Sequence, residues 1–317
     1  DFVNIEYPTI QVIKNVDTDG DGTVDQENAI DWEWKLDTAT YQTGIAPVEN
    51  MPGTYTVSET QKPNYHVTSL VCKNGETEIV NEVSESANIT LKSGDKVVCT
   101  FTNARNLGQL IVKKVVVNDN GGILEAKDFS FKVDSADAVS FTPVEGNALL
   151  GENKFTKYAG LSYNIVEVEA DQRGYTTTYD NCTNVTVPHN GTATCTITNN
   201  DNKPSLKLVK EVVNDNGGDK VATDWTLTAT GPVTVTGDGV ATSGDNFEAG
   251  TYTLSEAGKA GVDVSGYKAG SWSCTNDITV NESNQITVPL GKSTVCTIVN
   301  DDIAPKLTLN KIVSNTH

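Results

Sequence analysis

The chain of 317 residues contains one Met and three His, and it has neither a long apolar run nor an excess of basic residues. Because histidine is the side chain best suited to proton transfer at neutral pH, three scattered His residues argue against His-based catalysis and a His-rich metal site. Lys and Arg number 23 against 42 Asp and Glu, a formal charge of −19 that repels nucleic acid and anionic membranes. No apolar stretch approaches the ~20 residues of a membrane span. We therefore expect no nucleic-acid partner, no direct membrane contact and no required cofactor.

Similar segments recur along the chain with a period of about 100 residues, which indicates a tandem array of domains. The segment IQVIKNVDTDGDG at residues 10–22 returns as LIVKKVVVNDNGG at 110–122 and as LKLVKEVVNDNGG at 206–218. A shorter match, LTLNKIVSN, begins at residue 307. We therefore predict the end of a preceding repeat at 1–8, a first repeat at 9–106, a middle repeat at 107–203, a last repeat at 204–304, and the first strand of a following repeat at 305–317.

Apolar and polar residues alternate along short segments of every repeat, and this period of two is typical of β-strands. In the first repeat, Ile10, Val12 and Lys14 share one face of such a strand, and Trp32 and Trp34 share one face of the next. Gly, Asn and Asp turns separate the segments, and no segment has the helical period. The predicted fold is all-β: a tandem array of antiparallel, immunoglobulin-like β-sandwich domains. Short linkers at 104–108, 200–204 and 301–305 predict that the array forms an elongated rod.

The six Cys residues fall two to a repeat, and the second Cys of each repeat lies four residues before a terminal Asn. An even number of Cys at repeated positions in an acidic, β-rich chain favours one disulfide per repeat and an oxidising compartment. A metal site is the weaker interpretation, because the chain has no Cys-x-x-Cys motif and no paired His. The predicted pairs are Cys72–Cys99, Cys182–Cys195 and Cys274–Cys296.

One Lys, one Glu and one Asn lie on the apolar face of their strands at the same place in every repeat. Because isolated buried charges are costly, two interpretations are open. In the first, Lys and Glu form a structural ion pair with Asn as a hydrogen-bonding neighbour. In the second, the neutral Lys amine attacks the Asn carboxamide, ammonia leaves, and a protonated Glu moves the protons, so that an intramolecular isopeptide bond forms. Trp32, Phe129 and Trp225 are candidates for the apolar walls that this chemistry requires.

The order of these motifs resembles the Cna B-type, SpaA-like prealbumin-like repeat domains of bacterial surface adhesins and pilins. The motifs are LxVxK in the first strand, GxYxVxE or a near relative in a middle strand, and Asn in the last strand, together with a VxNDNGG turn and two Cys. The resemblance covers essentially the whole chain, three times over. It implies that Lys of the first strand is joined to Asn of the last, with the Glu between them as catalytic proton shuttle. The implied sets are Lys14, Glu59 and Asn103; Lys114, Glu167 and Asn199; and Lys210, Glu256 and Asn300.

The first repeat also carries an acidic loop at residues 17–25, DTDGDGTVD, which matches the opening of a calcium-binding loop. Carboxylates two residues apart, with Gly at the sharp turn, supply the hard oxygen ligands that Ca²⁺ prefers. Asp17, Asp19, Asp21 and Asp25 are therefore predicted to hold Ca²⁺ in the first repeat, with a solvated acidic loop as the alternative. The same turn in the other repeats reads NDNGG, and the turn-forming tendency of Asn, Asp and Gly explains it better.

These features favour a structural role over catalysis. The predicted function is a stalk or fibre segment of an extracellular bacterial surface protein. Its predicted partners are the adjacent repeats of the same chain, and beyond them other copies in a fibre or a surface ligand. The alternative is an adhesin module that binds a host or neighbour-cell ligand, for which the stretch 256–273, with Tyr267 and Trp272, is the candidate surface. We expect no enzyme activity beyond self-directed isopeptide formation.

Overall fold

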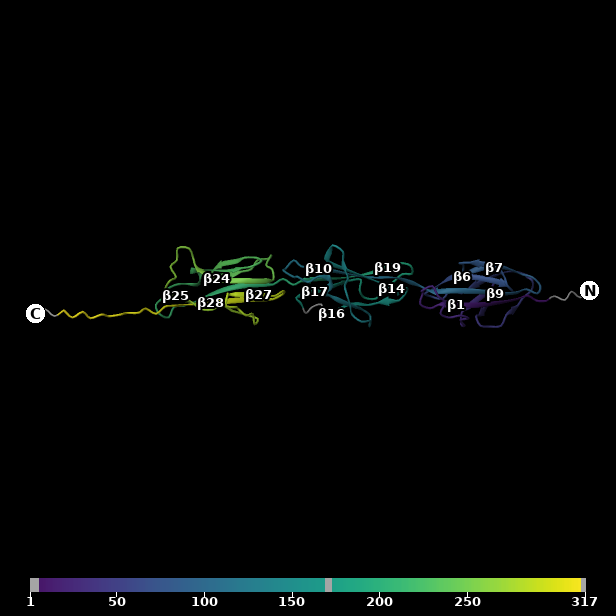
Figure 1. The fold of residues 1–317 in the computed structure, drawn as a ribbon, viewed down its shortest axis with the longest axis horizontal. Helices are drawn as coiled ribbons and strands as arrows, with labels where there is room; N and C mark the ends of the chain where they lie inside the picture. The colour runs from purple at the N-terminus through teal and green to yellow at the C-terminus, as the bar shows by residue number, and fades with distance from the viewer. Residues whose placement is uncertain (1–5, 169–172, 315–317) are drawn as a thin grey trace, which may run out of the picture. The chain divides into compact units, whose positions relative to one another are not determined.

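The computed structural model describes residues 6–168 and 173–314, and almost all of its regular structure is β-strand (Figure 1). Within these residues the helical elements are two short 3-10 helices, η1 (Ala126–Asp128) and η3 (Ala222–Asp224). No described helix has the length and apolarity needed to cross a membrane. The all-β prediction is confirmed.

Two compact units divide the chain, and the boundary between them passes through the middle repeat. One unit comprises Asp1–Val112, Asn153–Ile165 and Asn181–Cys195, and the other comprises Lys113–Glu152, Val166–Asp180 and Thr196–His317. This partition differs from the sequence repeats, whose boundaries stay predictions. Of the predicted flanking fragments, residues 1–5 and 315–317 lie outside the described residues, and residues 305–314 are exposed and form no strand.

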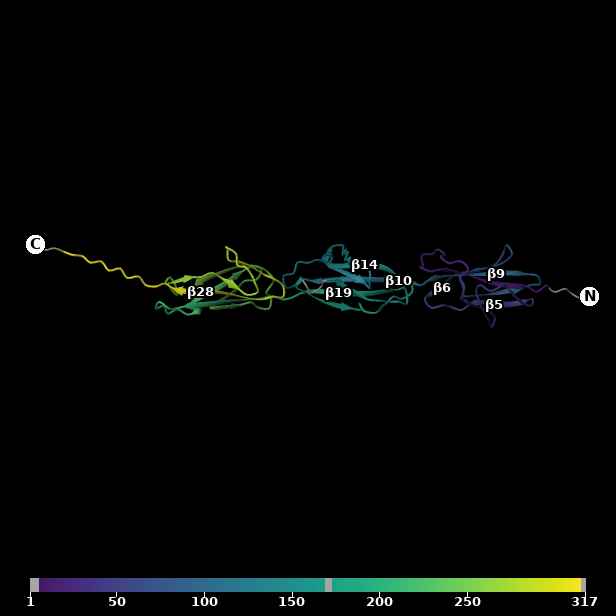
Figure 2. The same cartoon turned by 90° about the horizontal axis from the view of Figure 1, so that it is seen from below.

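In the first unit, the strands of the first repeat form two sheets, which Figure 2 shows as separate layers at β5 and β9. One sheet has the order β4-β1-β9-β6-β7 and consists of β1 (Thr9–Asp17), β4 (Val48–Glu49), β6 (Tyr65–Asn74), β7 (Thr77–Glu82) and β9 (Lys96–Arg105). The other has the order β3-β2-β5-β8 and consists of β2 (Glu33–Leu36), β3 (Ala39–Gln42), β5 (Gly53–Glu59) and β8 (Ser86–Leu91).

The middle repeat contributes strands to both units. Its largest sheet has the order β13-β14-β10-β19-β17 and consists of β10 (Leu107–Val117), β13 (Pro143–Val144), β14 (Asn147–Tyr158), β17 (Tyr175–Asp180) and β19 (Thr192–Asp201). Smaller sheets are formed by β11 (Ser130–Val133), β12 (Val139–Ser140) and β16 (Ile165–Val168), and by β15 (Ser162–Tyr163) and β18 (Val185–Thr186).

The last repeat lies in the second unit and again has two sheets. One has the order β23-β20-β28-β25, with β26 also paired to β28, and consists of β20 (Ser205–Val213), β23 (Val240–Thr242), β25 (Tyr267–Ala269), β26 (Ser273–Cys274) and β28 (Ser293–Asp302). The other has the order β22-β21-β24-β27 and consists of β21 (Trp225–Thr230), β22 (Val235–Asp238), β24 (Gly250–Gly258) and β27 (Gln285–Val288).

The core of the first repeat lies between its two sheets. Ile10, Val12 and Lys14 are buried at alternate positions of β1, as the period of two predicts. Trp34 of β2 and Phe101 of β9 are among the largest fully buried side chains. Because each large apolar side chain contributes about 1.5–3 kcal/mol when it is fully buried, this alternation determines which face of each strand turns inward.

The first and last strands of a repeat lie side by side and run in the same direction. β1 pairs with β9 in parallel, and β20 pairs with β28 in parallel. The predicted antiparallel sandwiches of these two repeats thus each contain one parallel pair, which the alternation of residues does not reveal because it carries no information on strand direction. As a result, the chain enters and leaves each of these two repeats at opposite ends.

The connections between repeats are shorter than predicted. β9 ends at Arg105 and β10 begins at Leu107, so Asn106 alone separates these strands. β19 ends at Asp201 and β20 begins at Ser205. Much of each predicted linker is therefore strand.

The three predicted disulfides are present. Cys72–Cys99 and Cys274–Cys296 join residues that lie directly opposite each other on neighbouring strands. Cys182–Cys195 joins the segment after β17 to β19. Each bond therefore joins the last strand of its repeat to a preceding segment of the same repeat. The structure contains no free Cys among the residues that it describes.

Removing one disulfide should destabilise its repeat without unfolding it. For the Cys182→Ala/Cys195→Ala variant, whose bond spans 13 residues, we expect the free energy of unfolding to fall by about 3 kcal/mol, since the cross-link restricts the unfolded chain. Urea denaturation measures the change, and thiol titration of the denatured, unreduced wild type should find no thiol. An unchanged urea midpoint would show that this bond does not stabilise the fold.

Candidate functional site

A buried cluster of polar side chains lies inside the first repeat. It consists of Lys14 of β1, Glu59 at the end of β5 and Asn103 of β9. Lys14 Nζ donates a hydrogen bond to Glu59 Oε2 at 2.5 Å, and Asn103 Nδ2 donates one to Glu59 Oε1 at 2.5 Å. One carboxylate therefore bridges the amine and the amide.

The pairing of the strands explains how these residues meet. β1 and β9 are neighbours in one sheet, where Val16 lies opposite Asn103. Lys14 lies two residues before Val16 on β1. Glu59 belongs to the other sheet, where it lies opposite Trp34 of β2. Because residues two apart on a strand share a face, Lys14 and Asn103 both point into the space between the sheets, where Glu59 lies.

The middle repeat has the same cluster with one additional member. Lys114 Nζ donates hydrogen bonds to Glu167 Oε1 and to Asn199 Oδ1. Thr177 of β17 lies between the second carboxylate oxygen of Glu167 and the amide nitrogen of Asn199. Its hydroxyl donates to Glu167 Oε2 at 3.0 Å and accepts from Asn199 Nδ2 at 3.2 Å. The sequence motifs did not indicate Thr177, because it belongs to a strand outside them.

In the last repeat Lys210 Nζ donates to Glu256 Oε2 at 2.5 Å. The buried Asn300 Oδ1 has no hydrogen-bond partner among the described residues, and the same is true of Asn103 Oδ1 in the first repeat. Leaving a buried carbonyl oxygen without a donor costs about 1–3 kcal/mol. The structure thus brings together each predicted Lys and Glu, with the predicted Asn buried on the strand beside the Lys strand.

An aromatic ring covers the amine in every repeat. The Lys Nζ lies 4.2 Å from the ring centroid of Trp32 in the first repeat, 4.1 Å from that of Phe129 in the middle one and 4.8 Å from that of Trp225 in the last. These are the predicted walls, and their position is confirmed. A Tyr packs edge-on against each wall and was not predicted, although its fixed spacing of seven residues before the first Cys was a signal: the pairs are Trp32–Tyr65, Phe129–Tyr175 and Trp225–Tyr267.

Burial changes the proton affinity of these groups. It lowers the pKa of Lys14 and of Lys114 to about 8, although the paired carboxylate of each opposes the shift. Burial also lowers the pKa of Lys210. It raises the pKa of Glu59, against the opposing effect of the Lys14 charge. These shifts favour a neutral amine with a free lone pair beside a carboxylic acid, which is what attack on an amide requires.

The acidic loop after β1 brings three carboxylates together. One oxygen each of Asp17, Asp19 and Asp21 lies within 4.8 Å of the others. The Asp17 carboxylate also accepts hydrogen bonds from the backbone N–H groups of two loop glycines, at 2.6 and 2.8 Å. Asp25 is not part of this cluster. Its carboxylate accepts hydrogen bonds from the backbone N–H and the hydroxyl of Thr18, both at 2.7 Å. The oxygen-only donor set suits Ca²⁺.

A second acidic cluster lies in the last repeat and was not predicted. Asp215, Asp301 and Asp302 have carboxylate oxygens within 4.8 Å of one another. Asp302 is committed to the NDNGG turn, because its carboxylate accepts the backbone N–H groups of Asn216 at 3.0 Å and Gly218 at 2.6 Å. This agrees with the expectation that the sequence NDNGG forms a structural turn.

The predicted aromatic binding surface in residues 256–273 is wrong. Trp272 is only 7% exposed and belongs to the hydrophobic core of the last repeat. Tyr267 packs against Trp225 at 5.3 Å between ring centroids, and its hydroxyl donates to Asn214 Oδ1 at 2.5 Å. Both rings serve internal packing, so the stretch offers no exposed aromatic pair.

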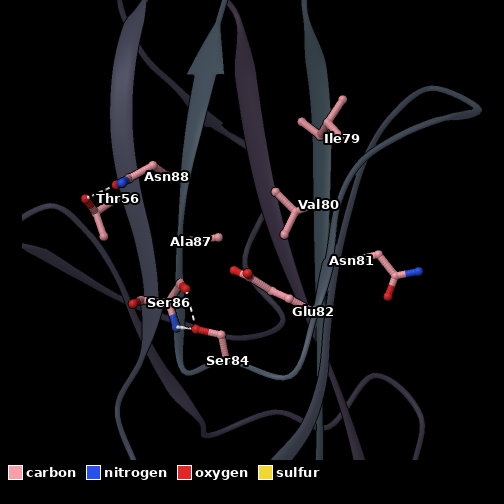
Figure 3. A pocket seen from close by; sticks show the side chains of 9 residues that line it. All are labelled: Thr56, Ile79, Val80, Asn81, Glu82, Ser84, Ser86, Ala87 and Asn88. Atoms are coloured by element: carbon pink, nitrogen blue, oxygen red, sulfur yellow. Dashed lines mark hydrogen bonds between the residues drawn. The ribbon is translucent and has the colours of Figure 1, made fainter.

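A surface pocket lies beside β7 and β8, which are edge strands of the two sheets of the first repeat (Figure 3). Most of its lining consists of small or polar side chains, and Ser84 and Ser86 hydrogen-bond to each other there. Glu82 is the one charged residue among those that line it. A single carboxylate among hydroxyls and amides gives no basis for assigning chemistry to this pocket.

The fold and the buried clusters define a class: tandem β-sandwich domains with a polar cluster between the first and last strands. The sequence matches the SpaA-type prealbumin-like fold domain over residues 106–200 and 201–298, and a related prealbumin-like fold domain over residues 16–105. The chain belongs to this family of prealbumin-like fold domains, so the resemblance to SpaA-like and Cna B-type domains is confirmed. No curated protein sequence matches the chain.

Several solved structures match the chain. The Bacillus anthracis TIE protein is 19% identical with a TM-score of 0.52, and the match covers 94% of this chain and 51% of that one. The chain thus spans about half the length of that protein, and the likeness shows the fold alone. A C-terminal fragment of the pilus adhesin SpaC from Lactobacillus rhamnosus GG is 13% identical, with a TM-score of 0.31 and coverage of 96% and 100%. A major pilin from Streptococcus pyogenes, T3.2, is 18% identical, with a TM-score of 0.31 and coverage of 62% and 99%.

In the Asn103→Ala variant, the buried Lys14 amine should make the free energy of unfolding depend on pH. In this variant Lys14 and Glu59 stay in place without an amide to react with. The folded Lys14 has a pKa of about 8 against an ordinary 10.5, so the unfolded chain binds more protons between these values and stability must rise with pH there. We expect a gain on the order of 3 kcal/mol across this window, measured by hydrogen exchange of β1 and β9 peptides after correction for intrinsic rates.

The matched control is Asn103→Ala/Lys14→Met, which lacks the titrating amine and should show no such rise. Glu59 is present in both variants, so the difference between their slopes reports on the Lys14 amine. Equal slopes in the two variants would contradict the lowered pKa of Lys14.

Proposed function

We propose that the chain is a load-carrying segment of an extracellular bacterial surface protein in which a Lys–Asn isopeptide bond closes each repeat. The observation that carries this proposal is the Lys–Glu ion pair of each repeat, together with the buried Asn on the strand beside the Lys strand. The proposed bonds are Lys14–Asn103, Lys114–Asn199 and Lys210–Asn300, with Glu59, Glu167 and Glu256 as proton shuttles.

The reaction needs no cofactor and no oxidant. The neutral Lys amine attacks Cγ of Asn, a proton moves from Nζ to Nδ2, and the Cγ–Nδ2 bond breaks with loss of ammonia. In the first repeat Glu59 contacts both nitrogens, so it is placed to take the proton from Lys14 Nζ at one oxygen and to supply Asn103 Nδ2 from the other. This geometry supports self-directed bond formation and no other catalysis.

Strand direction supports the mechanical role. Because β1 and β9 are parallel neighbours, tension on the two ends of the first repeat acts on these strands in opposite directions. A covalent bond between Lys14 and Asn103 would carry that tension and bypass the rest of the sandwich. We also propose the three-repeat organisation, which the short connections between the strands of successive repeats support.

The three disulfides support an extracellular location, because such bonds persist in oxidising surroundings. Similar folds occur in a pilus adhesin and a pilin. We therefore propose neighbouring repeats and other copies of the chain in a fibre as its partners. A role as a ligand-binding adhesin lacks the exposed aromatic surface on which that alternative depended.

Pulling the chain by its ends tests the mechanical function. Single-molecule extension of the wild type should show no unfolding step for any repeat, because the bonded strands cannot separate. The Glu59→Ala/Glu167→Ala/Glu256→Ala variant should instead show three unfolding steps. The exposed control Glu49→Ala/Glu211→Ala should behave as the wild type does. Three unfolding steps in the wild type would contradict the proposed function.

We further propose that Asp17, Asp19 and Asp21 bind Ca²⁺ in the first repeat, while Asp25 positions the loop through Thr18. The proximity of the three carboxylates supports this assignment. Although the Asp21 backbone hydrogen bond lowers the pKa of Asp19, desolvation and the charges of Asp21 and Asp25 outweigh it and raise the pKa. This repulsion between like charges is what a bound cation would relieve.

Ca²⁺ at millimolar concentration should raise the melting temperature of the first repeat, and a chelator should reverse the change, because a ligand of the folded state stabilises it by RT ln(1 + [L]/Kd). Asp19→Asn/Asp21→Asn should abolish the shift, which calorimetry measures. Asp301→Asn in the last repeat is the control and should leave the shift unchanged. A shift that survives in the Asp19→Asn/Asp21→Asn variant would place the ion elsewhere.

A further inference from the structure

Thr177 occupies a position that holds a different residue in each of the three repeats. It lies on β17 directly opposite Asn199 of β19. The residue opposite the corresponding Asn is Val67 in the first repeat and Ala269 in the last. Of these three opposite residues, Thr177 alone carries a hydroxyl group.

This hydroxyl completes a closed ring of polar contacts. Lys114 Nζ contacts Glu167 Oε1 and Asn199 Oδ1, so the amide presents its carbonyl oxygen to the amine. The amide nitrogen points the other way and donates to Thr177 Oγ1 at 3.2 Å, while Thr177 donates to Glu167 Oε2 at 3.0 Å. Glu167 therefore reaches the leaving nitrogen through Thr177, whereas Glu59 in the first repeat contacts its Asn nitrogen directly.

We infer that Thr177 is a catalytic residue of the middle repeat that relays a proton from Glu167 to the leaving nitrogen of Asn199. This inference rests on the proposed isopeptide bond. Once Lys114 Nζ adds to Cγ, Nδ2 becomes a tetrahedral amine with a lone pair and can accept a proton where it previously donated one. A hydroxyl suits the relay because it donates and accepts at the same atom.

The protons and electrons of the step balance. The step begins with Glu167 as a carboxylic acid protonated at Oε2, towards which the Thr177 hydroxyl turns from donor to acceptor. Lys114 Nζ gives one proton to Glu167 Oε1, and Glu167 gives the proton on Oε2 to Thr177 Oγ1. Thr177 passes its own hydroxyl proton to Asn199 Nδ2, and the Cγ–Nδ2 bond breaks with its electron pair leaving on ammonia. Glu167 and Thr177 end in their starting forms, and the new bond joins Nζ to Cγ.

The experiment follows bond formation in all three repeats of the same full-length molecules. The chain is made by cell-free synthesis under oxidising conditions, samples are denatured at intervals, and the linked peptides are quantified by mass spectrometry. Thr177→Val removes the hydroxyl at nearly constant volume, and Thr177→Ser keeps it. Thr178→Val, at the exposed next position of β17, is the control. The bonds of the first and last repeats serve as internal clocks.

Thr177→Val should slow formation of the Lys114–Asn199 bond by about tenfold or more relative to the internal clocks, as loss of a proton-transfer group does. Thr177→Ser should link within about twofold of the wild-type rate, and Thr178→Val should not differ from it. A wild-type rate in Thr177→Val, or a Thr177→Ser rate as slow as that of Thr177→Val, would overturn the relay while leaving the bond itself established. Absence of linked peptides from all three wild-type repeats would overturn the proposed function as well.

Discussion

Each repeat pairs a buried Lys amine with a Glu carboxylate, which is buried in the first and middle repeats and partly exposed in the last. Much of the surrounding structure accommodates that pair. Removing two ions from water costs several kcal/mol each, and apolar residues of similar volume would be as stable or more so. Stability alone therefore does not explain Lys and Glu at the same place in three repeats. The proposed reaction, which would convert the amine into an amide, explains it, because its product would no longer require a buried charge.

The turn after the first strand is fixed to the last strand in the middle repeat. The Asp201 carboxylate, two residues beyond Asn199, accepts the backbone N–H groups of Asn120 at 2.9 Å and Gly122 at 2.7 Å. Tyr175, which packs against the aromatic wall, donates its hydroxyl to Asn118 Oδ1 at 2.7 Å. The strand that carries Lys and the strand that carries Asn are thus tied together beyond the cluster itself. The last repeat uses Asp302 and Tyr267 in the same way.

The first repeat holds the turn after its first strand in a different way. Arg105 stands where the other repeats have Asp, and the acidic loop is held by its own Asp17. A carboxylate at position 105 would add negative charge beside a loop that already has four Asp residues. The exchange of Asp for Arg therefore fits the change of turn sequence.

The sequence was sufficient to predict the strands, the disulfide pairs and the polar cluster, because each depends on residue parity and on repetition. It did not reveal features that depend on which strands are neighbours. The parallel pairing of β1 with β9 is one, and the position of Thr177 opposite Asn199 is another. The burial of Trp272 was also missed, since an aromatic residue in a long irregular stretch gives no period from which to infer its direction.

The mass of the intact chain tests the central claim most directly. When the mass is measured after denaturation and reduction, the disulfides no longer affect it. Only the loss of ammonia then distinguishes the mass of a bonded chain from the mass that its sequence specifies. The account predicts a deficit of three ammonia molecules, one for each Lys–Asn pair. A mass equal to that of the unmodified sequence would contradict it and leave the three clusters as buried ion pairs.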